Sequence, residues 1–151
     1  MSKKVLMVCL GNICRSPTAE AILRHRSEKL NLNIHVDSAG TAGYHIGERS
    51  DLRSIKHAER RGYQMTHLAR QLSIQDFEVF DHVIVMDDSN YANASLVCPE
   101  HLLHKLEKMA HYDPRQVITH IPDPYYFGPE EFERVIDYLE TCIDGFVKKH
   151  F

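Results

Sequence analysis

A cysteine and an arginine stand six positions apart in the segment VCLGNICRSP, which spans residues 8–17. A cysteine thiolate is a nucleophile, and an arginine guanidinium binds two oxygens of a phosphate-like anion through parallel N–H groups. Gly11 and Asn12, between Cys9 and Arg15, are residue types that readily adopt left-handed backbone angles. A short arc of this kind can direct successive backbone N–H groups at one anion. The segment therefore favours nucleophilic attack on a bound oxyanion.

The residues around this segment support the interpretation, because the spacing of Cys9 and Arg15 alone also occurs by chance. An apolar run ends at Cys9, and Ser16-Pro17 predicts a helix start with Ser16 as the N-cap. A helix N-terminus and a nearby cation both favour the thiolate form of a cysteine, and the Ser16 hydroxyl is placed to donate to it. The alternative is a buried cysteine that ends a strand, with Arg15 in a surface ion pair. The sequence contains neither a dinucleotide-binding G-x-G-x-x-G nor a Walker G-K-[ST] motif.

Strands and helices alternate along the chain and predict the scaffold of this loop. Residues 4–9 form an apolar run typical of a strand buried on both faces, and the helix after it is expected to end near Leu30. Further strands are expected at 34–39, 82–86 and 105–109, a capped turn at 73–76, and helices at 51–61, 88–98 and 129–149. This order predicts a doubly wound α/β fold whose mostly parallel sheet carries the site at the carboxyl ends of its strands.

The composition is that of one globular domain and not of a membrane, secreted or nucleic-acid-binding protein. Of 151 residues 43% are hydrophobic, no apolar run is long enough to span a membrane, and the first residues lack a secretory signal pattern. Four cysteines are too few for a disulfide scaffold, so we expect a cytoplasmic protein with reduced thiols. Residues 1–70 carry a net charge of +6 and residues 71–151 one of −9, without the dense basic patch of a nucleic-acid binder.

Five segments of the sequence resemble those of the low-molecular-weight protein tyrosine phosphatases. They are residues 9–17, 37–41 (DSAGT), 67–72 (HLARQL), 86–90 (MDDSN) and 121–125 (IPDPY), in this order over essentially the whole chain. The resemblance implies a single domain over residues 1–151, with a four-stranded parallel sheet flanked by helices and a phosphate-binding loop after the first strand. It also implies a phosphotyrosine-containing protein or a small aryl phosphate as substrate, inhibition by phosphate-like oxyanions, and no metal or other cofactor.

The resemblance assigns catalytic roles to three residues. Cys9 is the nucleophile that forms a phosphocysteine, Arg15 holds the phosphate oxygens, and Asp123 is the general acid. Local sequence supports Asp123 less strongly than it supports Cys9. Asp123 lies between Pro122 and Pro124, which stiffen the loop, but a plain turn aspartate is the alternative.

Other residues are expected to surround these three. Substrate contacts are expected from loop residues and from aromatic side chains that can stack on an aryl group, namely Leu10, Gly11, Asn12, Ile13, Cys14, Ser16, Tyr44, Tyr125 and Tyr126. Ser38 and His67 match positions that brace the loop, Ser38 through Asn12. Cys14 matches a position from which a second thiol captures an oxidised Cys9 as a disulfide, and a small packing residue is the alternative.

Three other functions compete with this interpretation. Cys98, His101 and His104 recur at steps of three and are candidate zinc ligands, although Pro99 interrupts the turn and no fourth ligand is indicated. An arsenate reductase would need two further thiols close together, and Cys98 and Cys142 lie far apart in the sequence. A non-catalytic phosphotyrosine-binding module would be expected to lack one of the three catalytic residues, and all three are present.

Overall fold

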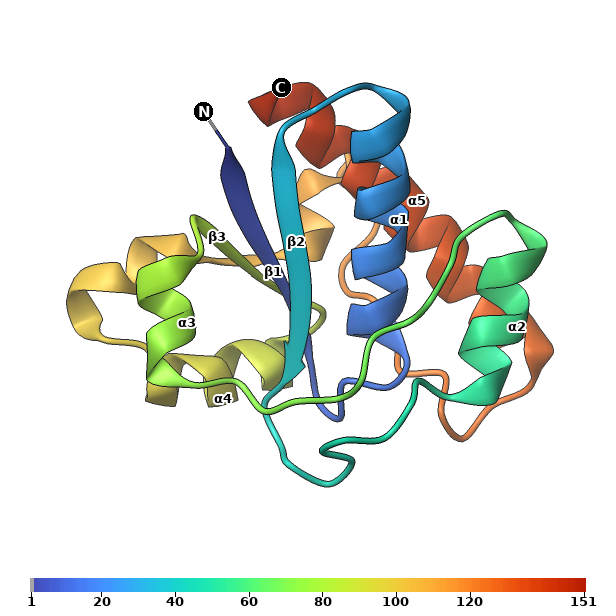
Figure 1. Cartoon of the computed structure of the whole chain (residues 1–151), viewed down its shortest axis with the longest axis horizontal. Helices are drawn as coiled ribbons and strands as arrows, with labels where there is room; N and C mark the ends of the chain where they lie inside the picture. Colours follow the sequence, from blue (N-terminus) through green and yellow to red (C-terminus); the bar gives the residue numbers. More distant parts are fainter. Residues whose placement is uncertain (1) are drawn as a thin grey trace.

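A computed structural model describes residues 2–151 and has a parallel sheet at its centre (Figure 1). Within these residues the sheet has four strands in the order β2-β1-β3-β4. The strands are β1 (Lys3–Cys9), β2 (Ile34–Gly40), β3 (His82–Val85) and β4 (Leu106–Lys108). Every pair of neighbouring strands is parallel, and the register aligns Cys9 with Gly40. The predicted fold class is confirmed.

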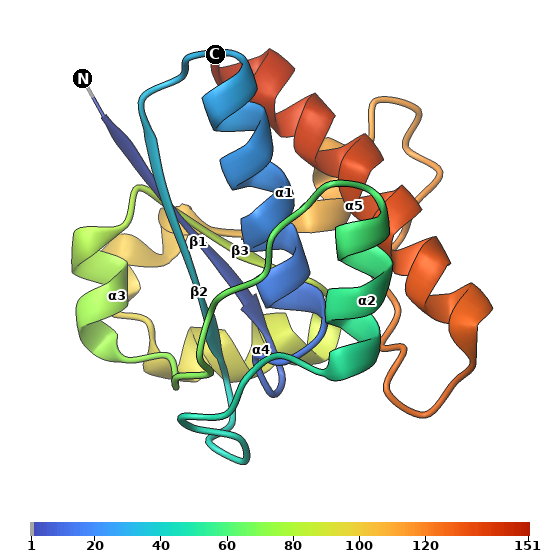
Figure 2. The ribbon, with the colours of Figure 1, turned by 45° about the vertical axis from the view of Figure 1, so that its right-hand side comes forward.

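Helices cover both faces of this sheet. They are α1 (Arg15–Lys29), α2 (Leu52–Arg60), α3 (Ile74–Val79), α4 (Asp88–Val97) and α5 (Pro129–His150), with short 3₁₀ segments η1 (Glu100–Lys105) and η2 (Met109–Tyr112). Figures 1 and 2 show α1, α2 and α5 on one side of the strands, and α3 and α4 on the other. None of the helices within residues 2–151 combines the length and apolar character needed to cross a bilayer.

The central strand explains why the chain begins with an uninterrupted apolar run. Val5 and Met7 pack into a core shared with α1 and α5, while Leu6 and Val8 pack into a second core on the opposite face. A strand buried on both faces loses the alternation of polar and apolar residues. This double burial fixes the position of Cys9, the last residue of β1, at the carboxyl end of the sheet.

Two local features differ from the sequence expectations. The predicted N-cap Ser16 is wrong, because α1 begins at Arg15 and the preceding residue is Cys14. The Ser16 hydroxyl is instead committed to Asn12 and Cys9 within the loop. The turn expected at 73–76 is the capping box that begins α3.

Candidate active site

The loop between β1 and α1 bends back at Asn12, whose φ of 59° lies in the left-handed region. The backbone carbonyls of Cys9, Leu10 and Ile13 accept N–H groups from outside the loop at 2.8–2.9 Å. At Gly40, where β2 passes this loop, an added Cβ would come within 2.7 Å of the Leu10 carbonyl oxygen. The loop is therefore held from outside through its carbonyl groups.

The backbone N–H groups of the same loop remain available to a ligand. Within the part of the chain that the structure describes, none of those in residues 11–15 donates to another backbone carbonyl. They precede and begin α1, and the N-terminus of a helix carries a partial positive charge. Convergent N–H groups at such a position form an anion-binding site.

The side chain of Asn12 joins the loop to three other segments. Its amide nitrogen donates to the hydroxyls of Ser16 (2.8 Å) and Ser38 (3.0 Å). Its oxygen accepts the backbone N–H of Arg70 (3.0 Å) and lies 2.8 Å from His67 Nε2. Asn12 therefore uses both its donor and its acceptor capacity, and Ser38 and His67 both contact it on the buried side of the loop.

A buried carboxylate completes this network. The Ser38 hydroxyl donates to Glu20 (2.6 Å), and His67 Nδ1 lies 3.3 Å from Glu20 and 3.4 Å from Asp37. Glu20 is not among the residues that the sequence predicts for the site. Its one local signal is its position four residues after Ser16 in α1, which directs both side chains to the same side of the helix.

Removal of the Asn12 side chain is expected to lower kcat/KM by roughly 10- to 100-fold, because buried partners lose hydrogen bonds worth about 1–3 kcal/mol. Asn12→Gly keeps access to the left-handed angle, whereas Asn12→Ala adds strain of about 1–2 kcal/mol. Both variants should therefore lose activity, and Asn12→Ala should also unfold at a lower urea concentration than Asn12→Gly. Steady-state kinetics and urea unfolding measure the two effects separately. Full activity of Asn12→Gly would contradict a positioning role for the network.

Arg15 is buried, with 2% of its surface exposed, and is oriented by two acceptors. Its NH1 group donates to Asp87 Oδ2 (2.6 Å) and to the Ile121 carbonyl (3.1 Å). Burial alone would lower the pKa of the guanidinium, but its electrostatic interactions with Cys9 and with the Asp87 carboxylate raise that pKa. Arg15 therefore remains a cation beneath the loop. Its other terminal nitrogen, NH2, lies 3.7 Å from Asp123 Oδ2.

Asp87 is a second residue of the site that the sequence does not predict. Besides holding Arg15, its carboxylate accepts the Asn90 N–H (2.7 Å) and so caps α4. Asp87 thereby fixes the guanidinium relative to the end of β3. The sequence marks Asp87 only as a possible helix cap directly after a predicted strand. Its ion-pair partner Arg15 lies 72 positions away, so no local pattern predicts that pair.

Cys9 and Cys14 both line the pocket above the loop and are both free thiols. The Cys9 sulfur lies 3.0 Å from the Ser16 hydroxyl oxygen. Burial raises the pKa of Cys14 to about 12. The two cysteines therefore share one pocket, while a disulfide between them stays a prediction.

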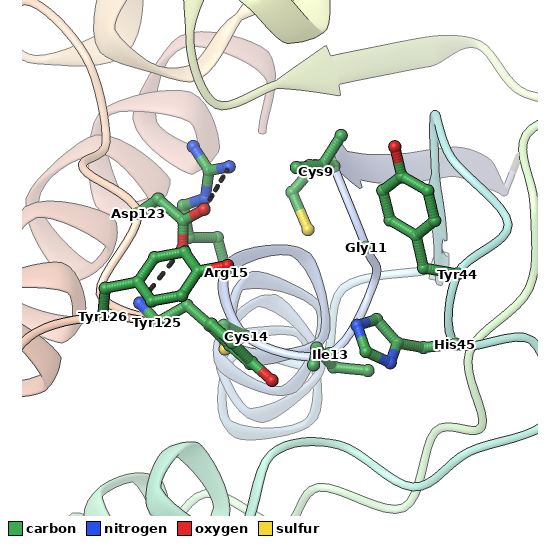
Figure 3. Close-up of a pocket in the computed structure, with 11 residues that line it drawn as sticks. Cys9, Gly11, Ile13, Cys14, Arg15, Tyr44, His45, Asp123, Tyr125 and Tyr126 are labelled. Carbon is green, nitrogen blue, oxygen red and sulfur yellow. Dashed lines mark hydrogen bonds and ion pairs between the residues drawn. The ribbon is translucent and has the colours of Figure 1, made fainter.

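The pocket encloses about 290 Å³. Its lining consists of Cys9, Leu10, Gly11, Ile13, Cys14, Arg15, Tyr44, His45, Asp123, Tyr125 and Tyr126. In Figure 3, Asp123 and the two neighbouring tyrosines lie on one side of Cys9, and Tyr44 and His45 on the other. Asp123 accepts the Tyr125 N–H (3.2 Å), and 42% of its side chain is exposed.

Three of the residues expected to contact the substrate are placed differently from the others. Asn12 and Ser16 do not line the pocket, because their side chains face the buried network. Tyr126 lines the rim but is 87% exposed. His45, which the sequence analysis did not single out, lies next to Tyr44 and opposite Tyr125, with 6.4 Å between the ring centres of His45 and Tyr125.

The candidate zinc ligands Cys98, His101 and His104 do not come together. Within residues 2–151, the groups of side chains close enough to hold a metal ion do not include them. α4 ends at Val97, Pro99 precedes η1, and the Cys98 thiol donates to the Pro99 carbonyl. Cys98 therefore caps the end of α4, whereas His101 and His104 belong to η1.

Comparisons with known proteins agree with this geometry. Residues 4–150 match the family model described as low molecular weight phosphotyrosine protein phosphatase. A human protein of that name is 40% identical over 98% of this chain and 96% of its own. The crystal structure of a protein tyrosine phosphatase from Entamoeba histolytica, with Hepes in its active site, superposes with a TM-score of 0.94 at 41% identity, covering 97% and 96% of the two chains.

A more distant structure is that of Vibrio vulnificus Wzb in complex with benzylphosphonate. It superposes with a TM-score of 0.87 at 28% identity, covering 97% of this chain and 98% of the other. The family model and the human relative each span nearly all of this sequence. The chain therefore belongs to the low molecular weight phosphotyrosine protein phosphatase family, a family of phosphoric monoester hydrolases.

Proposed function

We propose that this chain, as one domain over residues 1–151, hydrolyses phosphotyrosine and aryl phosphates through a phosphocysteine, without a metal. The observation that carries the proposal is the convergence of three groups on one pocket. The Cys9 thiol and the buried Arg15 cation lie beside the unpaired N–H groups of residues 11–15, and Asp123 lies at the rim. A nucleophile, an anion site and a proton donor are the parts that ester cleavage requires.

In the first step the Cys9 thiolate attacks phosphorus in line with the departing aryl oxygen. The S–P bond forms as the P–O bond to the aryl group breaks, and Asp123 donates its proton to that oxygen. The loop N–H groups and Arg15 hold the three equatorial oxygens, on which negative charge is spread in a loose transition state. Asp87 and the Ile121 carbonyl orient Arg15 for this contact.

In the second step water releases the phosphate. Asp123, now ionised, accepts a proton from the attacking water, the new P–O bond forms, and the S–P bond breaks. The electron pair returns to the Cys9 sulfur, 3.0 Å from the Ser16 hydroxyl, whose hydrogen bond stabilises the departing thiolate.

The pocket walls favour an aryl group as the leaving group. Tyr44 and Tyr125 flank the opening, where an aromatic ring can stack, and Tyr126 extends the rim. The benzylphosphonate named in the Vibrio vulnificus complex has the same combination of an aromatic ring and a phosphate-like head. Phosphotyrosine proteins or small aryl phosphates as substrates, inhibition by phosphate-like oxyanions, and a cytoplasmic location without nucleic acid or membrane partners stay predictions.

The test is hydrolysis of para-nitrophenyl phosphate and of paired peptides that differ only in carrying phosphotyrosine or phosphoserine, with and without excess chelator. We expect turnover of the aryl phosphate and the phosphotyrosine peptide, unchanged by the chelator and inhibited competitively by inorganic phosphate. Turnover of the phosphoserine peptide should be weak because a seryl oxygen is a poor leaving group. Loss of activity with chelator, or binding of phosphotyrosine without turnover, would contradict the proposal.

A further inference from the structure

A second group of chemistry-bearing side chains lies at the opposite end of the sheet from the active site. His82 is the first residue of β3, Glu107 lies in β4, and His150 is the last residue of α5. Because the strands are parallel, the beginning of β3 faces away from the carboxyl ends that carry the pocket. Figure 1 shows the end of α5 on the side of the molecule opposite the loop after β1.

These three side chains converge closely. One nitrogen of each histidine and one oxygen of Glu107 all lie within 4.8 Å of one another. His82 Nδ1 is 2.9 Å from Glu107 Oε2, and the Tyr112 hydroxyl contacts both Glu107 and His150 Nε2, the latter at 3.1 Å. In a tetrahedral site with metal–ligand bonds of about 2.0–2.2 Å, ligand atoms lie about 3.3–3.6 Å apart. The separations of the three groups, 2.9 Å for one pair and up to 4.8 Å for the others, bracket that range, so small side-chain rotations would bring them around one ion.

The surroundings hold the two imidazole rings in place. The ring of Phe146 contacts both, with ring centres 5.1 Å from His82 and 4.9 Å from His150. This packing limits how far either imidazole ring can turn.

We propose that His82, Glu107 and His150 bind one Zn²⁺ ion, with water or the Tyr112 hydroxyl at the fourth position. Two imidazoles and one carboxylate suit zinc and similar borderline ions, whereas Mg²⁺ and Ca²⁺ prefer oxygen ligands alone. The ion would join the end of α5 to the first residues of β3 and to β4. It lies outside the pocket and takes no part in the hydrolysis proposed above, so its role is to stabilise the fold.

The test uses untagged, chelator-treated and dialysed protein in a Cys9→Ser background, so that the thiol of the pocket cannot capture the metal. Co²⁺ binding is followed by the visible absorption of tetrahedral cobalt, and Zn²⁺ binding by calorimetry. We expect one equivalent of each ion, and binding weakened by more than about tenfold in H82Q/H150Q. The matched control is H101Q/H104Q, which removes two histidines from η1 and should bind as its parent does.

Thermal unfolding supplies a second measurement. Zn²⁺ should raise the unfolding midpoint of the Cys9→Ser protein and of H101Q/H104Q, but not that of H82Q/H150Q. If H82Q/H150Q loses its far-ultraviolet circular dichroism, the single variant Glu107→Gln replaces it in both measurements. The proposal is overturned if the parent binds no stoichiometric ion, or if the ligand variant binds as tightly as the control. The latter result would assign the ion to other groups, such as Glu20, Asp37 and His67 near the active site.

Discussion

Replacement of Cys9 by serine is expected to lower kcat for an aryl phosphate by at least roughly a thousandfold and to leave the fold intact. A serine hydroxyl is not ionised at neutral pH, so the buried cation and loop N–H groups have no nucleophilic anion to stabilise. The side chains are similar in size, and Cys9 is only 3% exposed at the end of a fully paired strand, so packing changes little. Steady-state kinetics and circular dichroism measure the two expectations.

The matched control is Cys98→Ser, which makes the same atomic change in a half-buried thiol outside the pocket. It should retain the activity of the parent. The Cys9→Ser protein should still bind phosphate, because Arg15 and the loop N–H groups are unchanged, and calorimetry with inorganic phosphate measures this. Appreciable turnover by Cys9→Ser would contradict the thiolate mechanism. Loss of turnover together with loss of the circular dichroism signal would show only that the variant fails to fold.

Replacement of Asp123 by asparagine is expected to lower kcat by roughly 10²- to 10⁴-fold for phosphotyrosine. An amide cannot donate a carboxylic acid proton to the departing phenolate. Its oxygen can still accept the Tyr125 N–H that the carboxylate now accepts, so the loop should keep its shape. Measured as kcat/KM, which reports only the first step, the loss should be much smaller for dinitrophenyl phosphate, because that phenolate departs without needing a proton.

The dependence of the loss on the leaving group distinguishes an acid from a merely structural aspartate. A series of substituted phenyl phosphates, assayed on Asp123→Asn and on its parent, provides this readout. Asp88→Asn serves as the matched control, since Asp88 is an exposed aspartate paired with Lys108 outside the pocket. A small loss of equal size across the whole series would argue against an acid role for Asp123.

The sequence predicts the elements of this fold wherever the signal is local. An apolar run that ends at Cys9 reflects a strand buried on both faces, and apolar residues at helical spacing reflect the buried face of α5. β4 has only a weak signal in the sequence, because it has three residues, of which only Leu106 is buried. The N-cap at Ser16 was wrong because a long-range network through Asn12 takes the hydroxyl that would otherwise cap the helix.

The candidate site shows the same division between local and distant signals. Cys9, Arg15 and their spacer are neighbours in the chain, so residue type and spacing predict their chemistry. Asp87 joins Arg15 across 72 positions, and Glu20 reaches Ser38 across 18, so no local pattern marks either partnership. Closeness in the chain can also mislead: Cys98, His101 and His104 are near one another in the sequence, but within residues 2–151 they form no cluster that could hold a metal ion.

The four cysteines should differ in their reactivity toward alkylating reagents. Burial raises the pKa of Cys14 and Cys142 to about 12, and it also raises the pKa of Cys98. Haloacetamides react with thiolates, so these three thiols should react slowly at neutral pH. Cys9, beside Arg15 and a helix N-terminus, should take up label first. A single equivalent of reagent would then count the catalytically competent molecules in a preparation, and bound phosphate would protect them from labelling.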